Sequence, residues 1–296
     1  MVAAVGGSES WRVLRAARYV STVCGSEVLA ITVIEPPPSS SSAHAPSPLI
    51  SDFEKQLRED GEDMLAREVF DVAGTEAVWK TAVIAGDPVS VLAELADAAH
   101  SHLLVMGLGR YAPWDRMLGR ETTLRVVRRS SCPVLAVSRT CEPPFESVLI
   151  ATDFSASSAA AARKVLPALS NGADLHIVHC WQPVARDDGR FSALDDRYRL
   201  SLPERFARFR ALLDVPAGVS VNHEVREGRT PEQLLEVVSR RDIDLIVVGR
   251  EGQSAKVRLV PGSVTTSLLR AATCALLIGG ELTADETDRL QALLST

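Results

Sequence analysis

The sequence lacks the features that a disulfide-stabilised, metal-binding or membrane-spanning protein needs. Its five cysteines are an odd number and no C-x-x-C pair occurs, so we expect neither a disulfide framework nor a zinc site. No apolar run approaches the ~18 residues that a membrane span requires. The N-terminus shows no basic region followed by an apolar stretch, which argues against a signal peptide. These absences predict a cytoplasmic protein with no membrane partner.

An excess of positive charge is missing too. The 32 Lys and Arg residues are outnumbered by 38 Asp and Glu residues, and the net charge is −6. A general nucleic-acid binder needs a positive surface that displaces counterions, so we expect no nucleic-acid partner. Hydrophobic residues at 46% and charged residues at 24% are typical of globular proteins. A length of 296 residues is about twice the common domain size and predicts two domains.

What the sequence does contain is a second copy of itself. The segment Gly25–Leu29 resembles Gly172–His176 at an offset of 147 residues, and His102–Gly107 resembles Asp244–Gly249 at an offset of 142. The smaller second offset places about five extra residues in the first copy, and the Pro/Ser-rich loop 36–48 accounts for them. Self-similarity at this period predicts two tandem units of the same fold.

The boundary between the copies lies near residues 139–144, where Pro143 and Pro144 indicate a short, stiff linker. We predict a first domain over 1–139, a second over 145–280 and a tail over 281–296. In the tail, residues 282–294 form a modestly amphipathic segment, which predicts a helix that docks on the surface.

Each copy alternates short apolar runs with segments of helical spacing. Apolar runs without polar alternation predict strands buried on both faces of a parallel sheet. The order of elements predicts an α/β protein made of two tandem, open, Rossmann-like parallel sheets with helices on both faces. Thr230 is the expected N-cap of a helix that starts at Pro231. The predicted strands are 148–152, 175–180, 219–225, 245–248 and 275–278, with 2–5 in the first copy, and the helices are 157–169, 203–213, 231–240 and 263–272.

Three features of the second copy follow strand ends and should meet at one edge of the sheet. Asp153 follows the first strand, Gly249 and Gly252 follow the fourth, and Gly262 and Ser263 open the next helix. Glycines let the backbone approach a phosphate, and a helix start offers free N–H donors to an anion. A carboxylate can accept hydrogen bonds from a ribose diol. Together these residues favour a nucleotide site.

Simpler explanations exist for each part. A glycine after a strand is often only a turn, Ser263 is often only an N-cap, and Asp153 can be a turn residue. The phosphate loop G-x-x-x-x-G-K-[ST] and the dinucleotide fingerprint G-x-G-x-x-G are both absent. A G-x-S-x-G elbow, which a serine hydrolase would show, is absent as well. His176 and His179 fall on opposite faces of a predicted strand, which disfavours a shared metal.

The run Ala-Thr-Asp-Phe-Ser over residues 151–155 and the pattern Gly249-x2-Gly252-x9-Gly262-Ser263-Val264 resemble the universal stress protein family, in tandem form. The resemblance covers residues 1–278 and implies a fold similar to that of the adenine nucleotide alpha hydrolases. It also implies bound ATP, with the ribose on Asp153. The implied adenine contacts are Ala151, Thr152 and Cys180, and the implied phosphate contacts are Gly249, Gly252, Gly262, Ser263, Val264 and Thr265.

The first copy departs from this pattern. Gly6 stands where Asp153 stands in the second copy, so the carboxylate is missing. Its loop reads Gly107-Leu108-Gly109, one residue shorter, and Arg120 replaces the serine after Gly119. We therefore expect the first domain to be a degenerate partner with a structural role.

These observations predict an ATP-binding, stress-response regulatory protein that holds its nucleotide in the second domain, with or without Mg²⁺. No strong general base or metal-ligand set is visible, so we expect no enzyme, or at most a weak ATPase. Two alternatives stay open: a scaffold of the same family that binds proteins and no nucleotide, and a nucleotidyl- or phosphoryl-transfer enzyme. The resemblance implies that last strands pair, either as an internal pseudo-dimer or as a homodimer. It also implies a regulatory protein partner, whose identity stays open.

Overall fold

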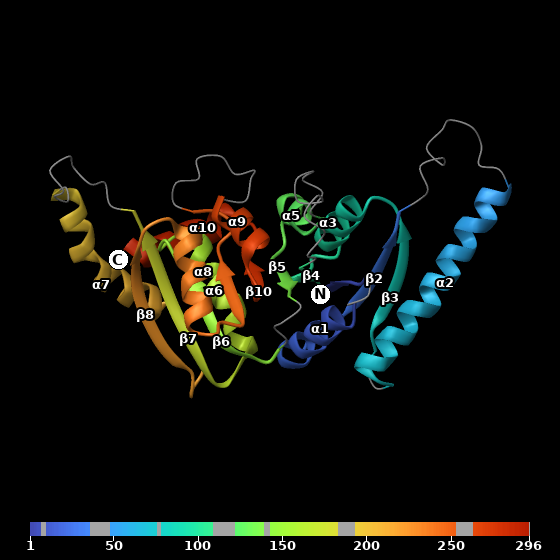
Figure 1. The fold of residues 1–296 in the computed structure, drawn as a ribbon, viewed down its shortest axis with the longest axis horizontal. Helices are drawn as coiled ribbons and strands as arrows, with labels where there is room; N and C mark the ends of the chain where they lie inside the picture. Colours follow the sequence, from blue (N-terminus) through green and yellow to red (C-terminus); the bar gives the residue numbers. More distant parts are fainter. Residues whose placement is uncertain are drawn as a thin grey trace. The chain divides into compact units, whose positions relative to one another are not determined.

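In the computed structural model, the chain forms two compact units, Met1–Pro143 (unit 1) and Pro144–Thr296 (unit 2), each a set of strands and helices (Figure 1). The linker residues 139–142 and the loop residues 36–47 lie outside the described part of the chain. The structure describes residues 1–6, 10–35, 48–75, 78–108, 122–138, 143–182, 193–252 and 263–295.

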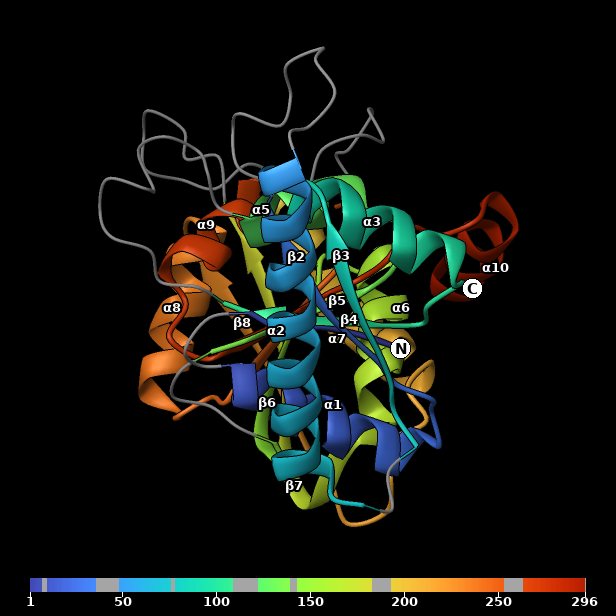
Figure 2. The same cartoon turned by 90° about the vertical axis from the view of Figure 1, so that its right-hand side faces the viewer.

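Unit 1 is built on a parallel sheet in the order β3-β2-β1-β4-β5. Its described strands are β1 (Val2–Ala4), β2 (Leu29–Ile34), β3 (Lys80–Ala85), β4 (Leu104–Gly107) and β5 (Val134–Val137), and its helices are α1 (Ser10–Cys24), α2 (Pro48–Ala73), α3 (Pro88–Ala98) and α5 (Thr122–Arg129). Figure 2 shows α2 running along β2 and β3, against which it packs. Leu65, Val69 and Ala73 of α2 join Leu14 and Val83 in a buried cluster there.

Unit 2 repeats this arrangement in the order β10-β9-β6-β7-β8, with every pairing parallel. Its described strands are β6 (Phe145–Ala151), β7 (Leu169–Trp181), β8 (Ser220–Glu227), β9 (Leu245–Val248) and β10 (Ala275–Ile278). Its helices are α6 (Ala156–Val165), a 3-10 turn (Leu166–Ala168), α7 (Ala193–Ala211), α8 (Thr230–Arg240), α9 (Ser263–Ala271) and α10 (Ala284–Ser295).

The helices of unit 2 form two layers. α8 packs with α9, whereas α10 packs with α6 and α7. All four residues of β9 and of β10 are buried, as expected for parallel strands covered on both faces. The predicted α/β fold with parallel sheets is therefore confirmed in each unit.

Local sequence explains where several helices begin. At α6, the Ser155 hydroxyl accepts a hydrogen bond from the Ser158 N–H at 3.2 Å, which satisfies one of the unpaired donors of the first turn. At α10, Thr283 and Glu286 form a reciprocal capping box: the Thr283 N–H donates to the Glu286 carboxylate at 2.9 Å, and the Glu286 N–H donates to the Thr283 hydroxyl at 3.2 Å.

Three predicted helix boundaries are wrong. Pro203 lies inside α7 and does not start it, because Leu202, Phe206 and Phe209 are buried and packing outweighs the cost of proline. Arg229, not Thr230, is the N-cap residue of α8, and no side chain caps it. The helix predicted to end at 169 ends at Val165, and β7 begins at Leu169. By contrast, β9 and β10 have the predicted bounds.

Within the described part of the chain, no helix combines the length and the apolar character needed to cross a bilayer.

Candidate functional site

The turn after β6 is held by its own hydrogen bonds. The Phe154 N–H donates to the Thr152 hydroxyl at 2.9 Å, and the Ser155 N–H donates to Asp153 Oδ1 at 3.1 Å. Phe154 has φ +60°, in the left-handed region that residues other than glycine seldom adopt. The turn thus presents Asp153, which is half-buried, at the carboxyl end of the central strand of unit 2.

The glycine segment after β9 packs against this turn. A Cβ atom at Gly252 would lie 2.9 Å from Asp153 Oδ2. A Cβ atom at Gly249 would lie 2.8 Å from the backbone nitrogen of Ser158 and 2.9 Å from Ser157 Oγ. A Cβ atom this close to backbone does not occur, so Gly249 requires glycine, whereas a side chain at Gly252 would displace the Asp153 carboxylate. The structure therefore brings Asp153 together with Gly252, although 98 residues separate them along the chain.

The residues predicted to contact adenine lie on neighbouring strands. Ala151 pairs with Val178 of β7, and Cys180 follows two residues later on the same face of the sheet. Burial raises the pKa of Cys180 to about 12, so its thiol is neutral near pH 7. The Thr152 side chain instead turns toward α6, where its hydroxyl lies 3.0 Å from that of Ser158. The backbone N–H and carbonyl of Thr152 are engaged as well, with Val178 and His179.

The predicted phosphate residues are described in part. Ser263 is the exposed first residue of α9, Val264 is half-buried and Thr265 is buried. Gly262 lies outside the described residues. The grouping of this helix start with the turn that carries Asp153 stays a prediction.

A supporting contact that the sequence did not reveal lies beneath the turn. His179 Nδ1 lies 2.8 Å from the Thr152 carbonyl oxygen, to which it must donate, so Nε2 accepts from the Tyr198 hydroxyl at 2.7 Å. Burial lowers the pKa of His179, which keeps the ring neutral. The ring centroids of His179 and Phe154 are 4.6 Å apart. Strand alternation places His179 on the face of α7, but it does not identify Tyr198 as its partner.

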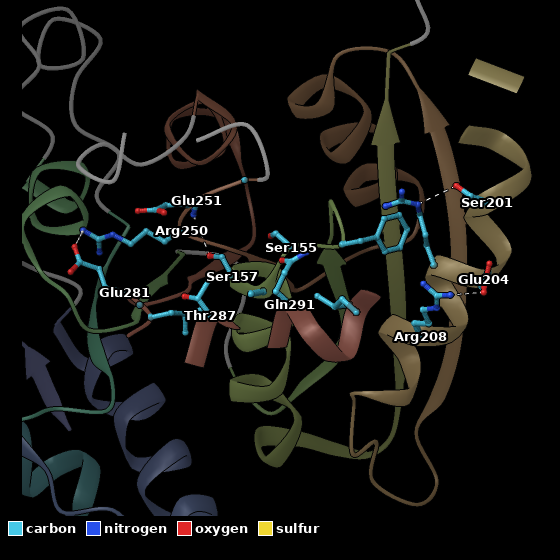
Figure 3. Close-up of a pocket in the computed structure, with 17 residues that line it drawn as sticks. Ser155, Ser157, Ser201, Glu204, Arg208, Arg250, Glu251, Glu281, Thr287 and Gln291 are labelled. Atoms are coloured by element: carbon cyan, nitrogen blue, oxygen red, sulfur yellow. Dashed lines mark hydrogen bonds and ion pairs between the residues drawn. The ribbon is translucent and has the colours of Figure 1, made fainter. Parts of the chain in front are cut away.

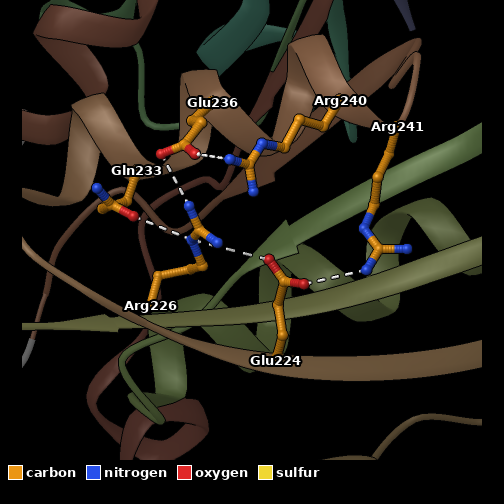
Figure 4. Close-up of polar contacts among 6 residues, drawn as sticks. All are labelled: Glu224, Arg226, Gln233, Glu236, Arg240 and Arg241. Carbon is orange, nitrogen blue, oxygen red and sulfur yellow. Dashed lines mark hydrogen bonds and ion pairs between the residues drawn. The ribbon is translucent and has the colours of Figure 1, made fainter.

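A network of charged side chains joins β8 to α8 (Figure 4). Arg226, the ladder partner of Cys180, donates to Gln233 at 2.9 Å and pairs with Glu236 at 2.8 Å. Arg241 pairs with Glu224 at 3.1 Å. Figure 4 shows these groups between strand and helix, where they fix α8 over the strand next to Cys180.

A cavity of about 970 Å³ lies in the layer of unit 2 that contains α6, α7 and α10 (Figure 3). The start of α6, α7, residues 250–252, residues 280–282 and α10 line it. Of the predicted nucleotide contacts that the structure describes, only Gly252 lines this cavity. The cavity and the predicted nucleotide site are therefore neighbours that share one residue. Among the residues that the structure describes, no group of three His, Cys, Asp or Glu side chains is arranged to hold a metal ion.

Unit 1 has the same backbone at this place without the carboxylate. The Val5 N–H donates to the Ile31 carbonyl at 2.7 Å, as the Thr152 N–H does to that of Val178 at 2.9 Å, so Gly6 occupies the position of Asp153. A Cβ atom at Gly6 would meet nothing within 4 Å. The predicted loop residues Gly109, Gly119 and Arg120 lie outside the described part.

Comparison with known proteins gives consistent results. The sequence profile of the Universal stress protein family matches residues 1–138 and 144–278. Universal stress protein Rv2005c of Mycobacterium tuberculosis (strain ATCC 25618 / H37Rv) is 27% identical over 208 residues, covering 67% of this chain and 68% of that protein.

Two solved structures share the fold over nearly the whole chain. A universal stress protein from Archaeoglobus fulgidus DSM 4304 has a TM-score of 0.64 at 19% identity, covering 95% of this chain and 96% of that one. The functionally unknown protein PA1789 from Pseudomonas aeruginosa PAO1 has a TM-score of 0.60 at 15% identity, covering 99% and 96%.

Proposed function

The chain belongs to the universal stress protein family, and on this premise we propose that it is a stress-response regulatory protein whose second unit binds an adenine nucleotide, with ATP as the expected ligand. The observation that carries the proposal is the approach of Gly252 to Asp153 at the end of β6. In the order β10-β9-β6-β7-β8, the chain passes from β6 to β7 and β8 on one side of β6. It then crosses to β9 and β10 on the other side, so the strand order reverses at β6. Ligands of open parallel sheets bind at such a switch point.

Each group in the proposal has a physical role. The Asp153 carboxylate accepts hydrogen bonds from the ribose hydroxyls, and the backbone of Gly249 and Gly252 lets the phosphates come close. Ala151 and the neutral thiol of Cys180 form an apolar wall for the base. The start of α9 supplies N–H donors and the positive end of its dipole to the phosphates. The residues assigned to the phosphates are Gly249, Gly252, Gly262, Ser263, Val264 and Thr265.

Nucleotide binding serves regulation in this proposal, because a ligand stabilises whichever conformation or assembly binds it best. No residue is assigned as a general base, so we expect slow turnover at most. Mg²⁺, if bound, would be held chiefly by the phosphates themselves. Unit 1 acts as a structural partner. A cytoplasmic location, self-association through the last strands and a protein partner belong to the same proposal.

Calorimetric titration of the full chain with ATP tests this function. We expect one site per chain and an affinity at least about tenfold lower in Asp153→Asn, which keeps the shape but removes the charge. Asp288→Asn, an exposed residue of α10, is the matched control and should titrate like the wild type. Equal affinities in Asp153→Asn and wild type would refute the assignment of Asp153, and no ATP binding by the wild type would favour the scaffold.

A further inference from the structure

The cavity bounded by α6, α7 and α10 has no role in nucleotide binding as proposed above, yet its size suits a ligand. Its volume of about 970 Å³ is at the upper end of the range of small-molecule pockets. Figure 3 shows the paired Arg208 and Glu204 at one end and the paired Arg250 and Glu281 at the other. Between them lie hydroxyl and amide side chains from α6 and α10.

In both ion pairs the arginine side chain is less exposed than the glutamate side chain. The Arg208 side chain is 30% exposed and that of Glu204 is 67% exposed. The Arg250 side chain is 5% exposed and that of Glu281 is 50% exposed. In both pairs the guanidinium is the more buried group and the carboxylate faces solvent, where water and salt screen it. The guanidinium groups are therefore the more buried charges of these two pairs, although the carboxylates of Glu204, Glu251 and Glu281 line the cavity as well.

Arg205 adds a third guanidinium to the lining of the cavity. Arg205 Nε donates to Ser201 Oγ at 3.1 Å, and its guanidinium carbon lies 5.3 Å from the ring centroid of Tyr198. Arg205 and Arg208 lie one turn apart on α7 and both line the cavity. The planar fork of a guanidinium group matches the geometry of a carboxylate or a phosphate.

The floor of the cavity is partly apolar. Phe154 and Ala156 line it from the turn and from α6, and Leu282 and Leu294 line it from the chain before α10 and from α10 itself. Phe154 and Ala156 are already buried, whereas Leu282 and Leu294 are half-buried and leave apolar surface open to the cavity. A ligand that carries both an anionic group and an apolar body would pair with the arginines and cover the two leucines.

From this lining we infer that unit 2 has a second binding site, which takes a small organic anion with an apolar body. Its carboxylate or phosphate group lies at Arg205 and Arg208, and its body packs on Leu282 and Leu294. The tail helix α10 is a wall of this site. Asp153 does not line the cavity, so the site operates without it.

Fluorescence titration of the full chain with 1-anilinonaphthalene-8-sulfonate tests this inference, since the dye joins a sulfonate to an aromatic body. We expect saturable binding that weakens at least about tenfold in Arg205→Gln/Arg208→Gln. Arg210→Gln, an exposed arginine on the same helix that does not line the cavity, should leave the affinity unchanged. Asp153→Asn should also leave it unchanged, which separates this site from the proposed nucleotide site.

A second pair of variants tests the site from α10. Leu294→Glu places a carboxylate in the cavity and should abolish the saturable binding, whereas Leu293→Glu should not. Leu293 is 54% exposed and does not line the cavity, so it is the matched control for charge and for helix stability. Thermal unfolding of both variants checks that they fold.

Competition identifies the anionic group. Displacement of the dye by phenyl phosphate would assign a phosphate ester, and displacement by phenylacetate would assign a carboxylate. Displacement by neither would overturn the inference. Absence of saturable dye binding to the wild type, or dye affinity unchanged in both Leu294→Glu and Arg205→Gln/Arg208→Gln, would overturn it as well.

Discussion

The two units have the same strand order and differ in how tightly the chain packs where the order reverses. A Cβ atom at Gly249 of unit 2 would lie 2.8 Å from the backbone of α6, but a Cβ atom at Gly107 of unit 1 would lie 3.8 Å from the side chain of Val13. The same residue type is thus required in one unit and only tolerated in the other. The unit that keeps the carboxylate at Asp153 is also the unit in which the glycine is sterically required.

The two units also differ in the side chain beneath the turn that follows their first strand. His179 of unit 2 bonds both the Thr152 carbonyl and Tyr198. Thr32 occupies the equivalent position in unit 1, and its hydroxyl is buried with no hydrogen-bond partner in the described part of the chain. In the described part of unit 1, the residue at this position therefore gives the turn no support of the kind that His179 gives in unit 2.

The largest difference between the units is expected when Gly249 and Gly107 are replaced by alanine, each in a separate variant. Gly249→Ala places a methyl group against the Ser158 nitrogen and should lower the free energy of unfolding by about 1–3 kcal/mol, because the backbone of α6 must shift. Gly107→Ala should stay within about 0.5 kcal/mol, since its Cβ has room. Urea unfolding of the two variants measures the difference, and equal losses would contradict the steric argument.

A smaller effect is expected at the histidine contact. Tyr198→Phe keeps the ring but leaves His179 Nε2 buried without a donor, so the free energy of unfolding should fall by about 1–2 kcal/mol. The counterpart in unit 1 is Thr32→Val, which removes a buried hydroxyl that makes no bond. That variant should be neutral or up to about 1 kcal/mol more stable. A destabilised Thr32→Val would show that Thr32 has a partner in the native protein.

Acid should act on unit 2 through the same histidine. Burial is the main cause that lowers the pKa of His179, and Arg205 adds to it, whereas the Thr152 carbonyl and Asp153 act in the opposite direction. Below about pH 6.5 the unfolded chain therefore binds more protons than the folded one, and stability falls as the pH falls.

Unfolding free energies of wild type and His179→Gln between pH 8 and 5 measure this effect. The decline with acid should be shallower in the variant, although His176, whose pKa burial also lowers, still contributes to it. Equal declines would mean that His179 does not titrate in this range.

The smallest effect is expected when the missing carboxylate is restored to unit 1. Gly6→Asp meets open space, so the free energy of unfolding should change by no more than about 0.5 kcal/mol. We expect no additional ATP site by calorimetry, because the glycine pattern after Gly107 is also altered. A second ATP site in this variant would show that the carboxylate alone separates the two units.

The sequence predicted those parts of the structure that depend on local pattern or on topology. Apolar runs gave β9 and β10 their correct bounds, and the rule that parallel strands end at one edge brought Asp153 to Gly252. Pro203 was misassigned because its helix-starting preference was outweighed by the burial of its neighbours. The His179–Tyr198 bond and the cavity were not predictable, since both depend on how α7 and α10 pack on α6.

The way α10 is attached has a consequence for trimmed or shortened forms of the protein. Proteolysis after Gly280 would remove Glu281, Leu282 and the whole of α10, and with them one wall of the cavity, while every strand described in unit 2 would be retained. A relative that ends at this point would keep Asp153 and its glycines but not the arginine-lined pocket. Shortening of the C-terminus alone would therefore remove the proposed cavity site and keep the residues of the proposed nucleotide site.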